Sequence, residues 1–135
     1  MNSNTIALVR QSWAQVVPIA PQAATLFYQN LFAADPTLRP LFKNNMVEQG
    51  HKLTQMLGMA VSKLDDLETL VPVLQDLAQR HVRYGVQANH YQTVGAALLK
   101  TLEQGLGAEF TPPVRDAWAA VYGVVADVMV NASKN

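Results

Sequence analysis

Apolar residues recur at intervals of three and four along almost the whole chain, and this spacing restricts the fold more than any other feature. It is the spacing of one face of an α-helix, and no stretch alternates convincingly between apolar and polar residues as a half-buried strand does. The clearest apolar stripe lies near the C-terminus and consists of Val114, Ala117, Trp118, Val121, Tyr122, Val125, Val128 and Met129. The pattern therefore predicts an all-α fold.

Proline, glycine and capping residues divide this pattern into about seven helices. Pro18 and Pro21 end the first helix, and Asp35-Pro36 opens a short one, because an acceptor followed by proline favours a helix start. Gly85 is suited to end the helix that Asp65 or Asp66 caps. The expected helices cover 6–17, 24–32, 36–42, 49–63, about 66–84, 91–106 and 112 to near the C-terminus. A chain of 135 residues suits one domain, which we expect to span 1–135.

Composition and charge exclude several classes of protein. Ten basic and ten acidic residues give no net charge, so the chain lacks the field that holds a nucleic acid backbone. The absence of cysteine excludes disulfide scaffolds, thiolate catalysis and thioether-linked haem. Residues 1–5 do not resemble a secretory signal, and the most apolar stretch, 117–130, is too short to span a membrane. We expect a soluble, cytoplasmic protein without membrane insertion.

One of the three histidines, His81, lies on the apolar face of its predicted helix. Leu74, Leu77 and Ala78 precede it by seven, four and three residues, which places all four on one side. A core histidine with locally satisfied nitrogens is one interpretation, and a metal ligand facing a cavity is the other. A neutral imidazole is a ligand that haem iron takes in oxygen-binding proteins. Glu48-x-x-His51 matches only half of a di-iron signature, which needs two such motifs.

Large apolar side chains on other predicted helices provide the parts of a pocket for a flat apolar ring. Tyr28 and Phe32 lie on the predicted helix 24–32 and Phe42 on 36–42, and Leu53 and Leu57 share a stripe on the next helix. Each side chain alone is typical of an ordinary core. Their joint arrangement shifts the balance toward a cofactor pocket.

These residues resemble the globin family, and the resemblance covers essentially the whole chain. Tyr28, Phe32, Pro36 and Phe42 follow one another at gaps of four, four and six. This is the family's spacing for the distal residue of helix B, its next core turn, the helix C proline and the haem-stacking phenylalanine. The run Gln-Arg-His-Val-Arg-Tyr-Gly-Val around His81 matches the region of the family's proximal histidine.

Other short motifs are similar to particular branches of this family. Arg10-Gln-Ser-Trp in the first helix resembles neuroglobin-like globins. His90-Tyr-x-x-Val-Gly and the segment from Ala117-Trp118 to Tyr122-Gly123 resemble helices G and H of bacterial single-domain haemoglobins and flavohaemoglobin haem domains. The resemblance implies a globin fold without helix D. It also implies a non-covalent haem b, iron protoporphyrin IX, in a pocket between helices E and F.

The resemblance further implies that His81 binds the iron. Lys52, Arg80 and Arg83 are placed to meet the haem propionates. The residues expected to contact the cofactor are His81, Phe42, Leu53, Tyr28, Gln49, Lys52, Leu57, Leu77, Arg80, Tyr84, Val86, Tyr91 and Val94.

The distal side of this pocket can be placed by a physical argument. Globin helices B and E cross at close range, and Ala24 and Gly50 are small enough for that contact. Gln49 then lies at the distal gate and Leu53 over the iron, whereas His51 points away because it lies about 200° from Gln49 around the helix. We therefore expect no permanent sixth ligand from the chain, with occasional ligation by His51 or Tyr28 left open.

Tyr28 and Gln49 can each donate a hydrogen bond to a bound gas. Such bonds favour dioxygen over the less polar carbon monoxide, so we expect reversible dioxygen binding at a pentacoordinate ferrous haem, for storage, transport or scavenging. The alternative is nitric oxide dioxygenation with a separate reductase, and a haem-based gas sensor is the third possibility. Relatives that oxidise nitric oxide efficiently carry a fused flavin reductase, which we do not expect here, and a glutamate where this chain has Ser133. We expect a gas-binding protein rather than an enzyme, present as a monomer or weak homodimer.

Overall fold

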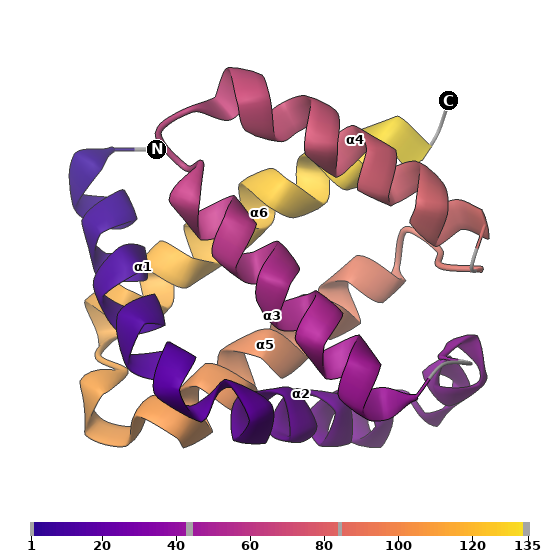
Figure 1. Ribbon diagram of the computed structural model, residues 1–135, viewed down its shortest axis with the longest axis horizontal. Coiled ribbons are helices and arrows are strands. Elements are labelled where there is room, and N and C mark those ends of the chain that lie inside the picture. The colour runs from indigo at the N-terminus through magenta and orange to yellow at the C-terminus, as the bar shows by residue number, and fades with distance from the viewer. Residues whose placement is uncertain (1, 43–44, 84, 134–135) are drawn as a thin grey trace.

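The computed structural model describes residues 2–42, 45–83 and 85–133, and these form six α-helices and three short 3₁₀ helices without a strand (Figure 1). The prediction of an all-α fold is confirmed, and the predicted short helix 36–42 is the 3₁₀ element η2. The elements in chain order are α1 (Ser3–Val16), η1 (Val17–Ile19), α2 (Ala20–Ala34), η2 (Pro36–Leu41), α3 (Met46–Ser62), α4 (Leu67–Arg83), α5 (His90–Leu106), η3 (Gly107–Glu109) and α6 (Pro112–Ser133).

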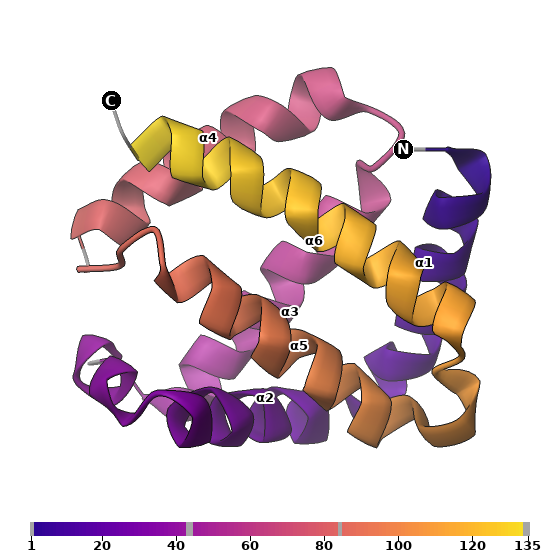
Figure 2. The same ribbon diagram turned by 180° about the vertical axis from the view of Figure 1, so that it is seen from behind.

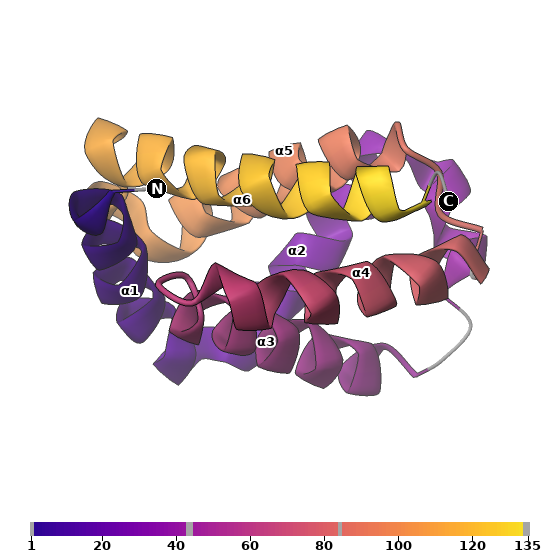
Figure 3. The same cartoon turned by 90° about the horizontal axis from the view of Figure 1, so that it is seen from above.

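The helices form two layers. Seen from above, α5 and α6 lie in one layer and α3 and α4 in the other (Figure 3). Helix α6 packs against both α1 and α4, while α2 packs against both α3 and α5. From behind, α6 runs from α1 toward the second half of α4 (Figure 2). The last turns of α6 therefore lie close to the part of α4 that carries His81.

A buried polar pair joins the first and last helices. Trp118 is almost fully buried, and its Nε1–H donates to the hydroxyl of Ser12 at 2.7 Å. The Ser12 hydroxyl in turn donates to the carbonyl of Leu8 at 2.8 Å. Because buried polar groups are costly without a partner, this chain of hydrogen bonds allows the indole to lie in the core.

The predicted close crossing of two helices is confirmed at Gly50 and Ala24. A Cβ atom added at Gly50 of α3 would lie 3.1 Å from the Cβ of Ala24 in α2. Helix backbones come this close only where small residues meet, which explains a glycine inside a helix despite its cost of about 1 kcal/mol relative to alanine. The contact fixes α3 against α2 immediately beside Gln49.

Several predicted helix starts need correction or refinement. Helices α1 and α2 begin at Ser3 and Ala20 rather than at 6 and 24. Helix α3 begins at Met46, not at 49, because the Asn45 side chain accepts from the backbone N–H groups of Val47 and Glu48 at 2.8 and 3.4 Å. Asp66, rather than Asp65, caps the start of α4 by accepting from the Thr69 backbone and hydroxyl.

The segment between η2 and α3 agrees with the expected absence of helix D. Only residues 42–45 separate the two elements, and 43 and 44 lie outside the described residues. Such a segment is too short for a helix of its own. Within the part of the chain that the structure describes, no helix is long and apolar enough to cross a membrane.

Candidate functional site

His81 lies near the end of α4, on the side that continues the helix's apolar stripe. Leu70, Leu74 and Ala78 of this helix are buried, and His81 is half-buried. The ring Nδ1 lies 2.8 Å from the carbonyl oxygen of Leu77, one turn earlier. Because a carbonyl can only accept, Nδ1 carries the proton and Nε2 has the lone pair. The local geometry therefore selects the tautomer in which Nε2 can act as a metal ligand.

The surroundings of His81 favour its neutral form. Burial lowers the pKa of the imidazole because it removes the charged form from water, and the nearby charge of Arg80 lowers it further. The hydrogen bond to Leu77 raises the pKa, but this effect is smaller than the lowering caused by burial. A neutral imidazole is the form that binds a metal ion.

The chain turns sharply just after His81 and returns toward α5. Gly85 has a φ of +92°, a left-handed conformation that glycine adopts without strain, as expected for the residue that ends this helix. The backbone N–H of Val86 then donates to the carbonyl of His81 at 3.0 Å. Val86 is thereby held beside the histidine, whereas the predicted site residue Tyr84 lies outside the described residues.

Three aromatic rings pack together where α2 meets the end of η2. Phe42 lies 5.5 Å from Tyr28 and 5.4 Å from Phe32, measured between ring centroids, and both contacts are edge-on. Edge-to-face packing at such distances is favourable for aromatic rings. The structure thus brings together the aromatic side chains that the sequence placed in one pocket.

Tyr28 also makes a direct link to Gln49. Its hydroxyl donates to the main-chain carbonyl of Gln49 at 3.3 Å, so the two predicted distal residues are neighbours. Burial raises the pKa of Tyr28 to about 12, which keeps the hydroxyl protonated and able to donate at neutral pH. The Gln49 side chain is half-buried.

The apolar residues predicted to line the pocket share one property. Each is only half-buried although it packs against the hydrophobic core. They come from the end of η2, from α3, from α4, from the turn after α4 and from α5. In Figure 1 the end of α4 and the start of α5 lie at the right, above η2, and α3 begins at the lower right and runs across the middle. The residues are Phe42, Leu53, Leu57, Leu77, Val86 and Val94.

The predicted polar contacts of the propionates are exposed. Lys52 and Arg83 lie on the surface, and Arg80 forms an ion pair with Asp76 of its own helix. His51 is exposed too, in agreement with the expectation that it points away from the pocket.

Tyr91 is buried, and its main chain is tied to α6. Its carbonyl oxygen accepts from the Tyr122 hydroxyl at 2.6 Å, and burial raises the pKa of Tyr122. Gly95 makes room for this arrangement, since a Cβ atom there would lie 2.6 Å from the Tyr122 ring. The first turns of α5 are thereby fixed against α6.

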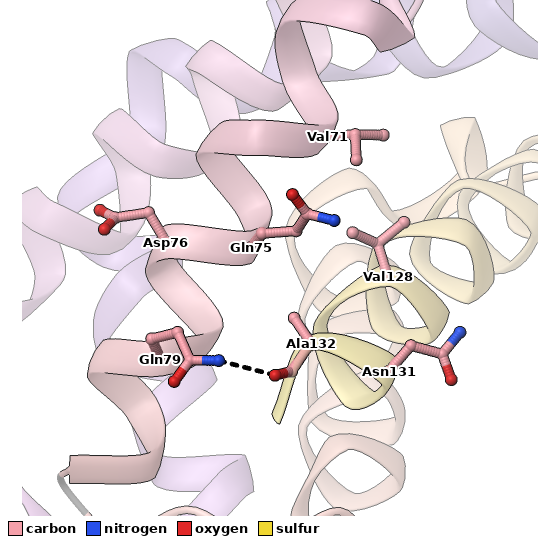
Figure 4. Close-up of a pocket in the computed structure, with 7 residues that line it drawn as sticks. All are labelled: Val71, Gln75, Asp76, Gln79, Val128, Asn131 and Ala132. Atoms are coloured by element: carbon pink, nitrogen blue, oxygen red, sulfur yellow. Dashed lines mark hydrogen bonds between the residues drawn. The ribbon is translucent and has the colours of Figure 1, made fainter. Parts of the chain in front are cut away.

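A groove of about 520 Å³ lies between α4 and α6, and the sequence predicted none of its lining residues (Figure 4). Gln79 closes one side of it by donating from Nε2 to the carbonyl oxygen of Ala132 at 2.7 Å. No sequence motif marks this bond, because the two residues are 53 positions apart. The Leu77 carbonyl beside His81 was likewise not predicted as a partner of the imidazole.

The donor set fits a haem rather than a metal ion held by the protein alone. No group of three or more histidine, cysteine or carboxylate residues that could hold a metal ion occurs among the described residues, so a di-iron centre has no support there. A single neutral imidazole beside half-buried apolar and aromatic side chains suits a ring that supplies the remaining iron ligands itself.

Comparison with known proteins agrees with this geometry. The globin family model matches residues 25–129. A flavohemoprotein of Bordetella parapertussis is 37% identical over 112 residues, which are 80% of this chain and 28% of that protein. A flavohemoprotein of Bacillus cereus is 29% identical over 134 residues, covering 97% of this chain and 33% of that protein. The chain thus spans about a third of the length of these relatives.

Two solved structures share the whole fold. A bacterial globin from Campylobacter jejuni has a TM-score of 0.86 and 26% identity, with 98% of this chain and 96% of that chain covered. An engineered carbene transferase, derived from a putative nitric oxide dioxygenase of Rhodothermus marinus, has a TM-score of 0.89 and 26% identity, with 99% and 94% covered. Together with the family match, these likenesses imply a haem cofactor that binds a gas. This chain belongs to the globin family.

Proposed function

We propose that this protein binds dioxygen reversibly with haem b as its cofactor and His81 as the iron ligand. The observation that carries the proposal is the hydrogen bond from Nδ1 of His81 to the Leu77 carbonyl. It orients the ring and leaves the lone pair on Nε2, as a second partner of a metal-bound histidine usually does. Haem, when bound, supplies the iron that takes the gas.

The residues on the opposite side supply hydrogen-bond donors. The Tyr28 hydroxyl and the Gln49 carbonyl are 3.3 Å apart, longer than the usual O–H···O distance of about 2.7–2.8 Å, so this bond is weak. The hydroxyl can therefore turn toward a better acceptor at little cost. Phe42 packs edge-on against the Tyr28 ring at 5.5 Å between centroids, and this apolar contact limits the access of water on that side of the ring.

The Leu77 carbonyl, one of the groups that interact with His81, favours binding over oxidation chemistry. A neutral backbone carbonyl raises the basicity of an imidazole less than a carboxylate does. The Ser133 hydroxyl donates to the Val130 carbonyl of its own helix at 2.7 Å, and a hydroxyl has no negative charge that could raise the basicity of the imidazole. This supports reversible gas binding as the main activity.

Nitric oxide dioxygenation is the second candidate function. The observation that favours it is the similarity to flavohemoproteins and to an engineered protein derived from a putative nitric oxide dioxygenase. The chain spans about a third of those flavohemoproteins. In this second proposal a reductase partner supplies the electrons that the activity needs. Dioxygen and nitric oxide would then be successive gas partners.

Substitution of the candidate ligand tests the proposal. We expect His81→Ala to lose the haem spectrum and to regain it when free imidazole is added, because a small ligand can replace the missing ring. His51→Ala is the matched control, since His51 is an exposed histidine on α3 and should leave haem binding unchanged. An unaltered spectrum in His81→Ala would exclude this ligand assignment.

A second measurement separates the two candidate functions. The wild-type ferrous protein should show a five-coordinate spectrum and should take up and release dioxygen repeatedly. Mixing the dioxygen-loaded protein with nitric oxide and a reductase should then give only a slow, limited formation of nitrate. Sustained nitrate production would favour the dioxygenase instead.

A further inference from the structure

The C-terminal ends of α4 and α6 are joined by one side-chain hydrogen bond (Figure 4). Nε2 of Gln79 in α4 donates to the carbonyl oxygen of Ala132 in α6 at 2.7 Å. This carbonyl is one of the last four of α6, for which the regular helix provides no backbone N–H donor. Ala132 is buried and the bond itself is partly buried, so the access of water to this carbonyl is reduced. Gln79 thus acts as a cap on the end of a helix distant in sequence.

Gln79 lies within the turn of α4 that holds the candidate iron ligand. The hydrogen bond of the imidazole spans Leu77 to His81, and Gln79 is the middle residue of that span. Two residues correspond to about 200° around a helix, so Gln79 and His81 project in nearly opposite directions. One face of this turn is therefore tied to α6, while the other presents the imidazole.

The bond restrains a movement that the apolar contacts around it resist only weakly. Val71, Val128 and Ala132 line the groove between the helices. Apolar contact is non-directional, so it opposes separation of the helices more than sliding along their length. A hydrogen bond weakens steeply with distance and angle and therefore opposes sliding as well. The ion pair of Asp76 and Arg80 joins two residues of α4 and does not provide this restraint.

We propose that Gln79 is a positioning residue for the proximal imidazole. By capping α6 at Ala132, it fixes the position of the turn from Leu77 to His81 along the axis of α4. The strength of the bond between His81 and the iron then depends on the end of α6. This inference rests on the proposed haem function.

Three variants test the proposal. Gln79→Leu removes the donor and keeps a side chain of similar size, and Gln79→Lys keeps a donor long enough to reach the Ala132 carbonyl. Gln75→Leu is the matched control, because Gln75 is an exposed glutamine one turn earlier on the same groove. The resonance Raman band of iron–imidazole stretching in the ferrous protein reports the position of His81. Transfer of haem to an excess of apomyoglobin reports how firmly His81 is held.

We expect the stretching band of Gln79→Leu to shift and broaden, and haem transfer to become about fivefold faster, as for the loss of one hydrogen bond. Gln79→Lys should restore both values, and Gln75→Leu should match the wild type. Should Gln79→Leu fail to fold, Gln79→Glu replaces it, because an ionised carboxylate of almost the same shape cannot donate.

Hydrogen exchange of the haem-free protein separates positioning from mere stabilisation. Faster exchange at the end of α6 together with an unchanged stretching band would show that Gln79 only caps the helix, and would overturn the inference. An equal band shift in Gln75→Leu would overturn it as well. If the wild type takes up no haem, the proposed function itself fails, which is a different outcome from haem binding with an unaltered band.

Discussion

Replacing Tyr28 with phenylalanine is the sharpest test of how the distal side holds a gas. The variant removes one hydroxyl and keeps the ring, which packs against Phe27 at 5.1 Å and against Phe42 at 5.5 Å between centroids. The aromatic cluster should therefore stay in place. We expect the variant to release dioxygen faster than the wild type.

The expected magnitude follows from the two bonds that the hydroxyl can make. A hydrogen bond to a charge-bearing acceptor contributes roughly 1.5–3 kcal/mol, against about 1 kcal/mol for an ordinary one. The bond to the Gln49 carbonyl is long, at 3.3 Å, so the hydroxyl gives up little when it turns to the gas. A net gain of about 1–2 kcal/mol corresponds to release that is about 5- to 30-fold faster in the variant.

Stopped-flow release of dioxygen measures this change directly. Carbon monoxide provides an internal control, because it is less polar when bound and should leave the variant at nearly the wild-type rate. Unfolding by urea should show a similar midpoint for the two proteins. If the dioxygen release rate of a fully haem-loaded Tyr28→Phe protein equals that of the wild type, the hydroxyl stays on Gln49 and is not a donor to the gas.

The other predictions concern stability. Gly50→Ala should lower the free energy of unfolding by about 1–2 kcal/mol, because the new methyl group would lie 3.1 Å from the Ala24 Cβ across the helix crossing. Gly123→Ala in α6 should raise this free energy by about 0.5–1 kcal/mol, because nothing lies within 4 Å of the new methyl group. Urea titration measures both, and a stabilised Gly50→Ala would contradict the close contact. Gly95→Ala should lower the free energy of unfolding by about 2–3 kcal/mol, because the new methyl group displaces the Tyr122 ring. An unchanged melting temperature would contradict this prediction. Burial raises the pKa of Tyr28 from 10.0 to about 12. The contribution of this residue to stability should therefore be complete below pH 10 and be lost toward pH 12, which denaturant midpoints measure. An equally steep fall in Tyr28→Phe would exclude this residue as the cause.

Features that depend on local spacing or residue volume could be predicted from the sequence. The burial pattern of α4 follows from its apolar stripe, which is why His81 could be placed on the apolar face of this helix. The crossing at Ala24 and Gly50 could be predicted because glycine inside a helix needs a reason. The sequence also contains a signal for the start of α3, because Asn45 is followed three residues later by Glu48, a capping pattern. The prediction missed this signal and began the helix at 49.

Features that depend on main-chain groups brought together by the fold could not be predicted. The Leu77 carbonyl beside His81 is a backbone acceptor that any residue at that position would provide. The bond from Gln79 to Ala132 joins a helix to another 53 residues away, and its acceptor is again a carbonyl. The Tyr28 hydroxyl meets the main chain of Gln49 for the same reason. Residue identity does not encode such partners, because every residue carries the same acceptor.

The tight contact between Ala24 and Gly50 also acts as a fulcrum. When a rod pivots about a fixed point, each part moves in proportion to its distance from that point. Gln49 is adjacent to the pivot of α3, and Tyr28 is one turn beyond the pivot of α2. Thermal swinging of α3 therefore displaces its far end, which Arg10 holds through the carbonyls of Val61 and Ser62, more than it displaces Gln49. The distance between Tyr28 and Gln49 should therefore fluctuate less than other distances between α2 and α3.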